Sequence, residues 1–421
     1  MDLRKDIAVI GGGAAGFFGA VNCAAMYPQH RITIFEKGNK LLSKVRVSGG
    51  GRCNVTHSCF DIQLLATHYP RGEKQLKSTF SRFMVSDTIK WFEARGVQLK
   101  TEPDGRMFPI TDSSQTIIDC LMEEAERHKV RIEMNADILK IACPTDPARA
   151  GFGREKTENG KLELSFRDAR KLSFDNVLIA TGGSPTNKGF EWLTKAGLSI
   201  ISPVPSLFTF NMPGNAITEL MGIATEPRVK ILNTKFEEEG PLLITHWGMS
   251  GPVVLKLSAL AARTLAEMNY QFAIQINWLP QLKEDDLRNA STNFKKELSL
   301  KSMTTRNPFA LPARLWEHLI GKAGIDEHRQ WSQLSKEQLH KLVNVLLYDH
   351  YDVKGKTTFK EEFVTCGGVA LNEIDFKTME SKKIKGLYFA GEVLDIDGVT
   401  GGFNFQSAWT TGYIAATAMG K

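Results

Sequence analysis

The sequence of 421 residues lacks most of the patterns that mark a specialised class of protein. Its six cysteines are scattered and include no C-x-x-C pair, which argues against a disulfide scaffold, a zinc site and a thioredoxin-type dithiol. No uninterrupted apolar run is long enough to span a bilayer, and there is neither an internal repeat nor a low-complexity tract. These absences leave a globular protein of two or three domains with reduced thiols, in which we expect no metal site.

Strong charge of one sign is also missing. The formal net charge of +6 is mild for this length and suits anionic ligands such as phosphates. No dense basic stripe is interleaved with aromatic residues, so solvated cations on helix faces explain the charge better than a nucleic-acid partner does. Arg4 and Lys5 precede an apolar stretch, as in a signal peptide, but Asp6 interrupts the basic start and no convincing cleavage site follows. We therefore expect a cytoplasmic location and no membrane partner.

What is present begins with a short buried strand, residues 6–10, that runs into a glycine motif. Gly11, Gly13 and Gly16 have the spacing G-x-G-x-x-G, and Glu36 closes the next strand. In this motif the first glycine permits a tight turn, the second lets a pyrophosphate approach the backbone, and the third lets helix and strand pack closely. The helix start offers N–H groups to the phosphates, and the acidic residue is placed to accept hydrogen bonds from ribose hydroxyls. The dinucleotide site predicted here comprises Gly11, Gly13, Ala14, Ala15, Gly16, Glu36 and Lys37.

Strand and helix patterns alternate through the first part of the chain. Helical patterns cover residues 74–96 and 113–128, residues 176–180 read as another buried strand, and residues 37–54 read as a loop. A hairpin excursion has its polar tip at residues 146–160. Alternation of this kind predicts a parallel sheet with helices packed on it.

The middle of the chain has a different pattern. Short strand-like pieces begin near residue 197, and residues 280–351 read as mostly helical. The chain then ends in a strand, residues 386–391, and a helix of small residues, 405–419. One discontinuous domain with a large insertion explains this order. The expected boundaries are 1–191 with 358–421 for the discontinuous domain, 192–280 for the β part of the insertion, and 281–357 for its helical part, which returns to the β part.

Further glycine-containing segments are expected to meet the dinucleotide. Glycines in residues 48–54 let backbone amides approach a flat ring, although a mobile surface linker is the alternative for this segment. Glu392, just past a strand, is placed to hold the polyol linker of a flavin, and a helix starting near Asn404 would point its positive end at the pyrimidine edge of the ring. NAD needs no such second site, so FAD explains both ends of the chain. From these segments we add Lys44, Ser48, Cys53, Asn54, Thr181 and Gly182 to the expected cofactor-binding residues.

Four motifs carry a resemblance to a known family. They are residues 48–54 (Ser-Gly-Gly-Gly-Arg-Cys-Asn), 245–252 (Thr-His-Trp-Gly-Met-Ser-Gly-Pro), 365–369 (Thr-Cys-Gly-Gly-Val) and 386–406. With them the chain resembles, over nearly its whole length, the BaiN/YhiN-like bacterial flavoproteins, also labelled NAD(P)/FAD-dependent oxidoreductase or aminoacetone-oxidase-like. The resemblance implies an α/β fold, a Rossmann-like FAD-binding domain of the glutathione-reductase type interrupted by an insert of a β-barrel plus a helical bundle.

The same resemblance implies which residues contact FAD. Main-chain groups near Ile138 would hold adenine. Two departures from the family pattern, a short segment after Gly183 and basic residues at 42–46, concern the substrate more than the flavin. The implied FAD contacts are Gly11, Gly13, Gly16, Glu36, Lys44, Gly50, Gly51, Arg52, Gly183, Gly391, Glu392, Gly402, Phe403, Asn404 and Gln406.

Two side chains are candidates for chemistry. His246 lies among apolar residues before a Gly-Pro turn and could donate a proton to a substrate carbanion or enolate, with a packed histidine whose nitrogens are satisfied as the alternative. Cys53 could be a redox thiol, but a small packing residue is favoured because no resolving cysteine lies nearby. No second G-x-G-x-x-G follows a strand in the middle of the chain, so any nicotinamide would visit transiently.

The sequence therefore predicts an FAD-dependent oxidoreductase acting on a small organic substrate at the interface between the FAD domain and the insert. Hydride transfer through flavin N5, with NAD(P)H as donor, is the leading interpretation. A flavin-dependent amine oxidase using O₂ stays open within this class. The mild positive charge and the helical insert support a second class, a flavoprotein that binds or acts on RNA, and a flavin-based redox sensor is a third.

Overall fold

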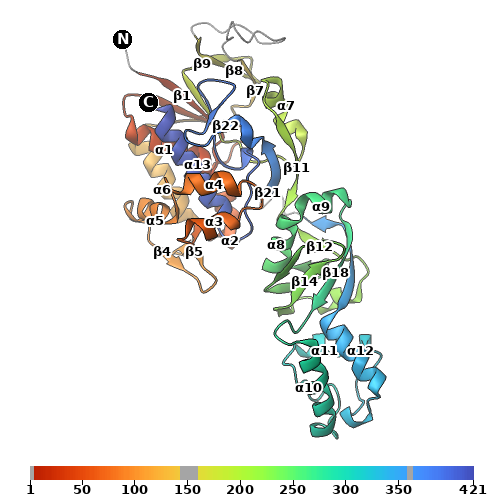
Figure 1. The fold of residues 1–421 in the computed structure, drawn as a ribbon. Helices are drawn as coiled ribbons and strands as arrows, with labels where there is room; N and C mark the ends of the chain where they lie inside the picture. Colours follow the sequence, from red (N-terminus) through yellow and green to blue (C-terminus); the bar gives the residue numbers. More distant parts are fainter. Residues whose placement is uncertain (1–3, 143–159, 358–363) are drawn as a thin grey trace. The chain divides into compact units, whose positions relative to one another are not determined.

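The computed structural model describes residues 4–142, 160–357 and 364–421. The chain divides into two compact units (Figure 1), unit 1 with residues 1–206 and 360–421, and unit 2 with residues 207–359. Residues 192–206, which the sequence pattern places in the β part of the insertion, lie in unit 1. The reason is that β11 (Ile200–Ser206) pairs antiparallel with β21 (Val364–Val369), so this segment is tied to the C-terminal part of the chain.

Unit 1 is built on a seven-stranded sheet whose central strands run parallel. β1 pairs in parallel with both β10 and β2, and β10 pairs in parallel with β24. β10 and nearly all of β1 are buried, as expected for apolar strands in a parallel sheet. The carboxyl ends of such strands meet at one edge, where α/β sheets bind their ligands. In sheet order the strands are β22 (Ile374–Asp375), β23 (Glu380–Ser381), β24 (Leu387–Phe389), β10 (Asn176–Ile179), β1 (Asp6–Ile10), β2 (Arg31–Phe35) and β6 (Arg131–Glu133).

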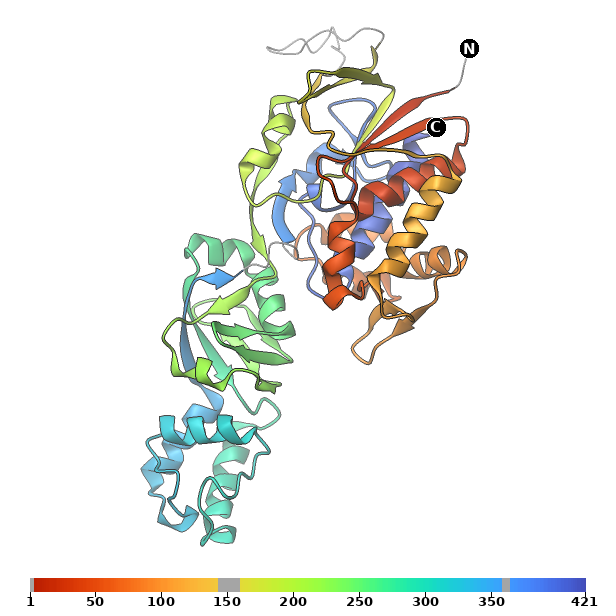
Figure 2. The ribbon, with the colours of Figure 1, turned by 180° about the vertical axis from the view of Figure 1, so that it is seen from behind.

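Helices α1 (Ala14–Met26) and α13 (Phe403–Met419) pack closely against each other in unit 1 (Figure 2). Their backbones approach because small residues face the contact, and a Cβ atom on Gly412 would lie 2.8 Å from the carbonyl oxygen of Ala15. α6 (Ser114–Arg127) packs against α1. The helical patterns predicted for the α6 and α13 regions are confirmed.

Two regions differ from the sequence expectation. The loop predicted for residues 37–54 contains a helix, α2 (Ser43–Gly51), which positive φ angles at Gly49 and Gly50 interrupt near its end. The helical pattern over residues 74–96 divides into α4 (Glu73–Phe80) and α5 (Val85–Glu93). The carboxylate of Asp87 accepts a hydrogen bond from the Met84 amide at 2.9 Å and so caps the start of α5. The periodicity of apolar residues does not show this break between the two helices.

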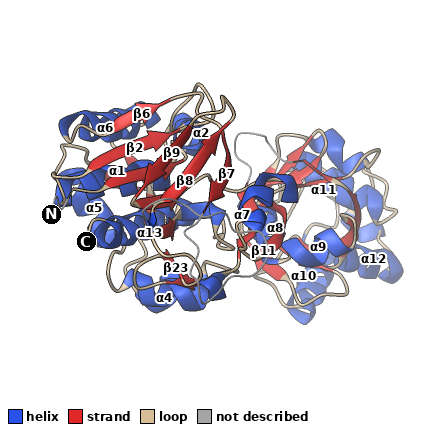
Figure 3. Cartoon of the chain, turned by 90° about the horizontal axis from the view of Figure 1, so that it is seen from above, coloured by secondary structure: helices blue, strands red, loops and turns tan. Residues whose placement is uncertain are grey.

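Besides the β11–β21 pair, two three-stranded antiparallel sheets and two further short helices belong to unit 1. Of the predicted hairpin tip at residues 146–160, only Gly160 lies within the described residues. One sheet contains β7 (Ile138–Ala142), β8 (Leu162–Phe166) and β9 (Lys171–Phe174) (Figure 3). The other contains β3 (Thr56–His57), β5 (Arg106–Pro109) and β4 (Leu99–Thr101), and the short helices are α3 (Ile62–Thr67) and α7 (Glu191–Lys195).

Unit 2 combines two antiparallel sheets with helices. The first sheet contains, in order, β13 (Ala224–Thr225), β16 (Leu242–Thr245), β17 (Gly248–Ser250), β12 (Thr209–Asn211) and β20 (Lys356–Thr357). The second contains β15 (Glu237–Glu239), β14 (Arg228–Ile231), β18 (Gln271–Asn277) and β19 (Asp349–Lys354). The helices are α8 (Pro252–Leu260), α9 (Ala262–Glu267), α10 (Glu284–Glu297), α11 (Ala313–Lys322) and α12 (Lys336–Leu347).

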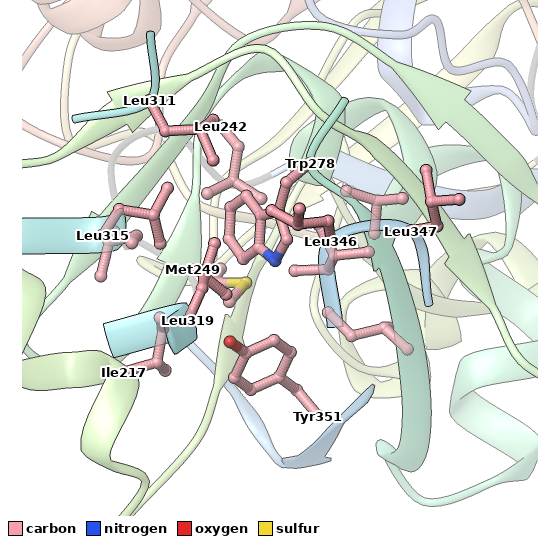
Figure 4. Close-up of a cluster of buried hydrophobic side chains, with 14 of the residues drawn as sticks. Ile217, Leu242, Met249, Trp278, Leu311, Leu315, Leu319, Leu346, Leu347 and Tyr351 are labelled. Atoms are coloured by element: carbon pink, nitrogen blue, oxygen red, sulfur yellow. The ribbon is translucent and has the colours of Figure 1, made fainter. Parts of the chain in front are cut away.

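The sheets and helices of unit 2 share one hydrophobic core (Figure 4). Met249 from β17, Leu319 from α11 and Leu346 from α12 are all buried in it, beside Trp278 and Tyr351. The indole N–H of Trp278 donates to the carboxylate of Asp349 at 3.0 Å, so the one polar atom of this ring is satisfied. Within the described ranges of both units, no helix combines the length and the apolar character needed to cross a membrane.

Candidate active site

The glycine motif after β1 forms a turn that leaves space for a ligand at one position only. Gly11 has φ +112°, and a Cβ atom there would lie 2.7 Å from the carbonyl carbon of Ala180. A Cβ atom on Gly16 would overlap the carbonyl oxygen of Gly11, so this glycine permits the contact between helix and strand. A Cβ atom on Gly13 would meet nothing within 4 Å, and no side chain caps α1 there. The open position faces a helix start with unshared amides, which suits a pyrophosphate.

Glu36 lies at the carboxyl end of β2, beside this turn. One carboxylate oxygen accepts from the amide of Gly12 and the other from the amide of Gly38, both at 2.8 Å. These bonds fix the carboxylate, and each oxygen keeps a lone pair for a ribose hydroxyl. The backbone oxygen of Glu36 accepts from the amide of Ala136 at 2.9 Å, which places the start of β7, with Ile138, in the same region.

Four separate chain segments meet at Glu392, just after β24. Its carboxylate accepts from the backbone amide of Thr365 at 2.9 Å and pairs with the Lys44 ammonium at 2.5 Å. A Cβ atom on Gly183 would lie 2.6 Å from a carboxylate oxygen of Glu392. Gly391, with φ +75°, donates its amide to Thr411 at 2.9 Å. The structure thus brings together Lys44, Gly183, Gly391 and Glu392, which the sequence predicts as cofactor residues.

The start of α13 is held by two asparagines. The Asn404 amide accepts from the Gly398 amide at 2.9 Å and donates to its carbonyl at 3.0 Å. In the orientation that satisfies both groups, the Asn54 amide accepts from the Gly402 amide and donates to the Thr56 carbonyl, each at 2.9 Å. Both predicted residues therefore shape the turn before the helix, and no side chain caps α13. Its positive end is left for an electron-rich group.

Phe403 and Gln406 point into the protein. The Phe403 ring packs against the rings of both His57 and His68, with centroid distances of 4.7 and 4.2 Å. Gln406 is fully buried, and its amide oxygen accepts from the Thr56 hydroxyl at 2.7 Å. These two predicted residues lock α13 to its neighbours.

Residues 50–53, just before β3, include both open and tightly packed positions. Cβ atoms on Gly50 and Gly51 would meet nothing within 4 Å, so backbone there is accessible to a ring. The Arg52 guanidinium lies 4.0 Å from the centroid of the Phe108 ring and pairs with Glu102 at 2.6 Å. Cys53 is completely buried, and burial raises its pKa to about 12, which makes it a poor nucleophile near neutral pH.

Four other predicted positions differ in their surroundings. A Cβ atom on Gly182 would meet nothing within 4 Å, so the chain after β10 is open to a ligand. Thr181 and Lys37 are exposed. Ser48 donates its hydroxyl to the Val45 carbonyl at 3.2 Å. Among the described parts of the chain, no group of three or more His, Cys, Asp or Glu side chains is placed to hold a metal ion.

His246 belongs to unit 2. It is exposed in the turn between β16 and β17, with its ring edge against Trp247 at a centroid distance of 4.4 Å. Its nitrogens make no hydrogen bond to the described residues. Exposure leaves both nitrogens available for a substrate.

Sequence reasoning missed three groups near the site. Thr365 contacts Glu392 through its backbone amide, and the Thr-Cys-Gly-Gly motif was the available signal. His57 has a buried Nδ1 without a hydrogen-bond partner, and burial lowers its pKa. Arg71 and Asp397 form an ion pair that nothing in the local sequence marks.

The chain matches a known protein family and several known proteins over nearly its whole length. The family model described as HI0933-like protein Rossmann domain matches residues 5–418. A ribosomal RNA dihydrouridine synthase of Escherichia coli (strain K12) is 30% identical, with 98% of this chain and 97% of that protein covered. A 3-dehydro-bile acid delta(4,6)-reductase of Clostridium scindens is 25% identical, with 98% of each covered. The crystal structure of a 3-ketosteroid-delta4-(5alpha)-dehydrogenase from Rhodococcus jostii RHA1 shares the fold at 12% identity, with a TM-score of 0.52 over 99% of this chain and 97% of that one.

Proposed function

Because the chain belongs to the HI0933-like family of Rossmann-domain proteins and is an FAD-dependent oxidoreductase, we propose that it reduces a carbon–carbon double bond conjugated to a carbonyl group. One observation carries the proposal. Two relatives that match over nearly the whole chain are named for reactions on chemically unrelated molecules, a uridine in ribosomal RNA and a 3-oxo bile acid. Both names describe saturation of a double bond that is conjugated to a carbonyl. The shared reaction is therefore a better inference than either substrate alone.

The residues of unit 1 fit FAD. The turn at Gly13 and the start of α1 would hold the pyrophosphate, and Glu36 would accept from the adenosine ribose. Glu392 and Lys44 would hold the polyol linker, and the uncapped start of α13 would stabilise the electron-rich edge of the ring. When bound, FAD supplies two-electron chemistry, accepting a hydride from a donor and passing it to the substrate.

The residues of the chain have then to orient the carbonyl and supply a proton. Saturation of the double bond adds a hydride at the carbon β to the carbonyl and a proton at the α carbon, while NAD(P)H is oxidised to NAD(P)⁺. We assign proton donation to His246, since its nitrogens are exposed and not hydrogen-bonded to the described residues. Neutral imidazole carries one N–H, which is sufficient for this role.

For the substrate we propose a uridine of RNA, in line with the 30% identical relative. The nucleobase contains the required conjugated double bond between C5 and C6, next to the C4 carbonyl. The moderate net charge of +6 is compatible with a substrate that is bound by few phosphate contacts.

The test uses purified holoprotein under anaerobic conditions. NADPH and NADH are each mixed with the oxidised protein, and bleaching of the flavin absorbance identifies the donor. The reduced protein is then given ribosomal RNA from a strain that lacks the gene, and the nucleosides are analysed by mass spectrometry. We expect uridine to gain two hydrogen atoms at a defined position. If neither nicotinamide bleaches the flavin but an amine does, the reductase proposal is wrong and the amine oxidase is favoured.

A further inference from the structure

A polar pocket lies entirely within unit 2, on the outer face of the sheet that contains β14 and β18. Val229 in β14 and Ile276 in β18 point into the core and are fully buried. The alternate residues face the other way, and the strand register sets Arg228 opposite Asn277 and Lys230 opposite Gln275. The sheet therefore presents two cations and two amides together.

The segment that leads into α10 and the end of α12 close this array into a cavity. The cavity has a volume of about 590 Å³, within the range of roughly 300–1,000 Å³ that is typical of ligand pockets. Besides the array, Gln281, Lys283 and Tyr348 line it. Tyr348 is 44% exposed and brings an aromatic ring, a group on which bases stack, to the pocket.

The acidic groups of the pocket have partners, and two of its cations do not. Glu237 pairs with Arg228 at 3.7 Å, and Glu284 accepts from the Tyr348 hydroxyl at 2.7 Å. Lys230 and Lys283 make neither a hydrogen bond nor an ion pair with the described side chains. Two unpaired ammonium groups beside a cavity favour an anionic ligand.

The amides are also only partly used. The Gln275 oxygen bonds His350 Nε2 at 3.2 Å, and the Asn277 oxygen accepts from the Leu279 amide at 2.9 Å. The NH₂ groups of both amides make no hydrogen bond within the described chain. Amide groups, an aromatic face and nearby cations together match the base edge, the base plane and the phosphate of a nucleotide.

We propose that this pocket binds an unpaired nucleotide of the RNA substrate, an inference that rests on the proposed function. An RNA strand that delivers one uridine to the reaction needs contacts elsewhere to hold it. A base in a duplex cannot enter a cavity, so the pocket selects single-stranded or looped RNA. It adds affinity for RNA without taking part in the reaction.

The test measures binding and needs no turnover. A fluorescein-labelled single-stranded oligoribonucleotide of mixed sequence is titrated with oxidised holoprotein, and anisotropy gives the affinity. We expect Lys230→Glu and Lys283→Glu each to weaken binding about tenfold or more. Lys336→Glu, an exposed site of α12 outside the pocket, is the charge-matched control and keeps the wild-type affinity.

Two further variants separate recognition from folding. Tyr348→Phe keeps the ring but loses the hydrogen bond to Glu284, whereas Tyr348→Ala loses both. We expect Phe to retain binding and Ala to lose it, with flavin content and circular dichroism confirming that both are folded. In Lys230→Gln the slope of log affinity against log salt should fall by about 0.7, the contribution of one phosphate contact on a single strand.

The outcomes distinguish this inference from the proposed function. If Lys230→Glu, Lys283→Glu and Tyr348→Ala leave the RNA affinity unchanged, the pocket does not bind RNA and the inference is wrong, even if uridine is reduced. A pocket that binds NADP⁺ but not the oligoribonucleotide overturns it as well. RNA that binds through the pocket but is never reduced by the reduced holoprotein contradicts the proposed function instead.

Discussion

Arg71 and Asp397 form a buried ion pair that joins distant parts of unit 1. Arg71 Nε donates to one carboxylate oxygen at 2.5 Å, and a second guanidinium nitrogen bonds the other. The Ser206 hydroxyl donates to the same carboxylate at 2.7 Å. Asp397 is completely buried, five residues before Gly402 and the start of α13. The pair therefore fixes the loop that leads to the proposed flavin contact.

Removing the arginine should strongly destabilise unit 1. Arg71→Ala leaves the Asp397 carboxylate buried without its charge partner, and we expect a loss of about 3–5 kcal/mol in the free energy of unfolding by urea. Replacing both residues with apolar ones of similar size, Arg71→Met with Asp397→Leu, should recover part of this loss. Wild-type stability in Arg71→Ala would contradict the assignment.

The same pair predicts a pH dependence. Burial raises the pKa of Asp397, while Arg71 and the Ser206 hydroxyl oppose this shift. Without the arginine the folded-state pKa rises further above the unfolded value, so protonation stabilises the folded form and stability is lost as pH rises. The free energy of unfolding by urea should therefore lie less far below that of wild type in Arg71→Ala at pH 5 than at pH 7.

Gly13→Ala and Gly16→Ala should impair different properties of the protein, the first FAD binding and the second stability. A Cβ atom on Gly13 meets no protein atom, so the first variant should fold with nearly unchanged apo stability but bind FAD about tenfold more weakly, or about 1.4 kcal/mol. A Cβ atom on Gly16 overlaps the Gly11 carbonyl, so the second should lose stability itself. Thermal unfolding of the apoproteins and fluorescence titration with FAD separate the two. Equal FAD affinity in Gly13→Ala and wild type would contradict the pyrophosphate site.

Buried thiols should make the protein sensitive to alkaline pH. Burial raises the pKa values of Cys23, Cys53 and Cys120 to about 12, against about 8.5 for a thiol in an unfolded chain. Their stabilising effect is complete below the unfolded pKa and is lost as pH rises toward 12. Each thiol should lower the unfolding free energy by about 1.4 kcal/mol per pH unit in this window. Cys120→Ala should show a correspondingly shallower decline between pH 9 and 11, and an identical decline would contradict the assignment.

His246→Ala should separate flavin reduction from substrate reduction. The variant should bind FAD and be bleached by the nicotinamide donor as wild type is, because the expected FAD contacts lie in unit 1. Saturation of the substrate double bond should fall by about 10²–10⁴-fold, the usual contribution of a positioned acid. His340→Ala, another exposed histidine of unit 2, is the control with unchanged rates. A wild-type rate in His246→Ala would exclude its role as the proton donor.

The dinucleotide motif was predictable because its information is local. Gly11 and Glu36 directly follow two adjacent strands, and Gly13 and Gly16 lie at the start of α1, so backbone geometry alone restricts which side chains are allowed. Phe403 and Gln406 show the limit of such reasoning. The sequence motif predicts that these residues lie near the cofactor site, but only the packing of the folded chain shows that both side chains point inward.

Sequence by itself determined the α/β fold class and its Rossmann-like character, since strand period, turn geometry and helix starts depend on neighbours along the chain. Tertiary structure alone decided the contacts between residues far apart. Arg71 and Asp397 are 326 positions apart, and Thr365 joins Glu392 only because β21 and the segment after β24 lie together. The pocket of unit 2 has the same origin, because Lys230, Gln275 and Tyr348 become neighbours only through strand register and helix packing. The sequence shows which side chains are charged or can form hydrogen bonds, but the folded chain decides which of these groups remain unpaired.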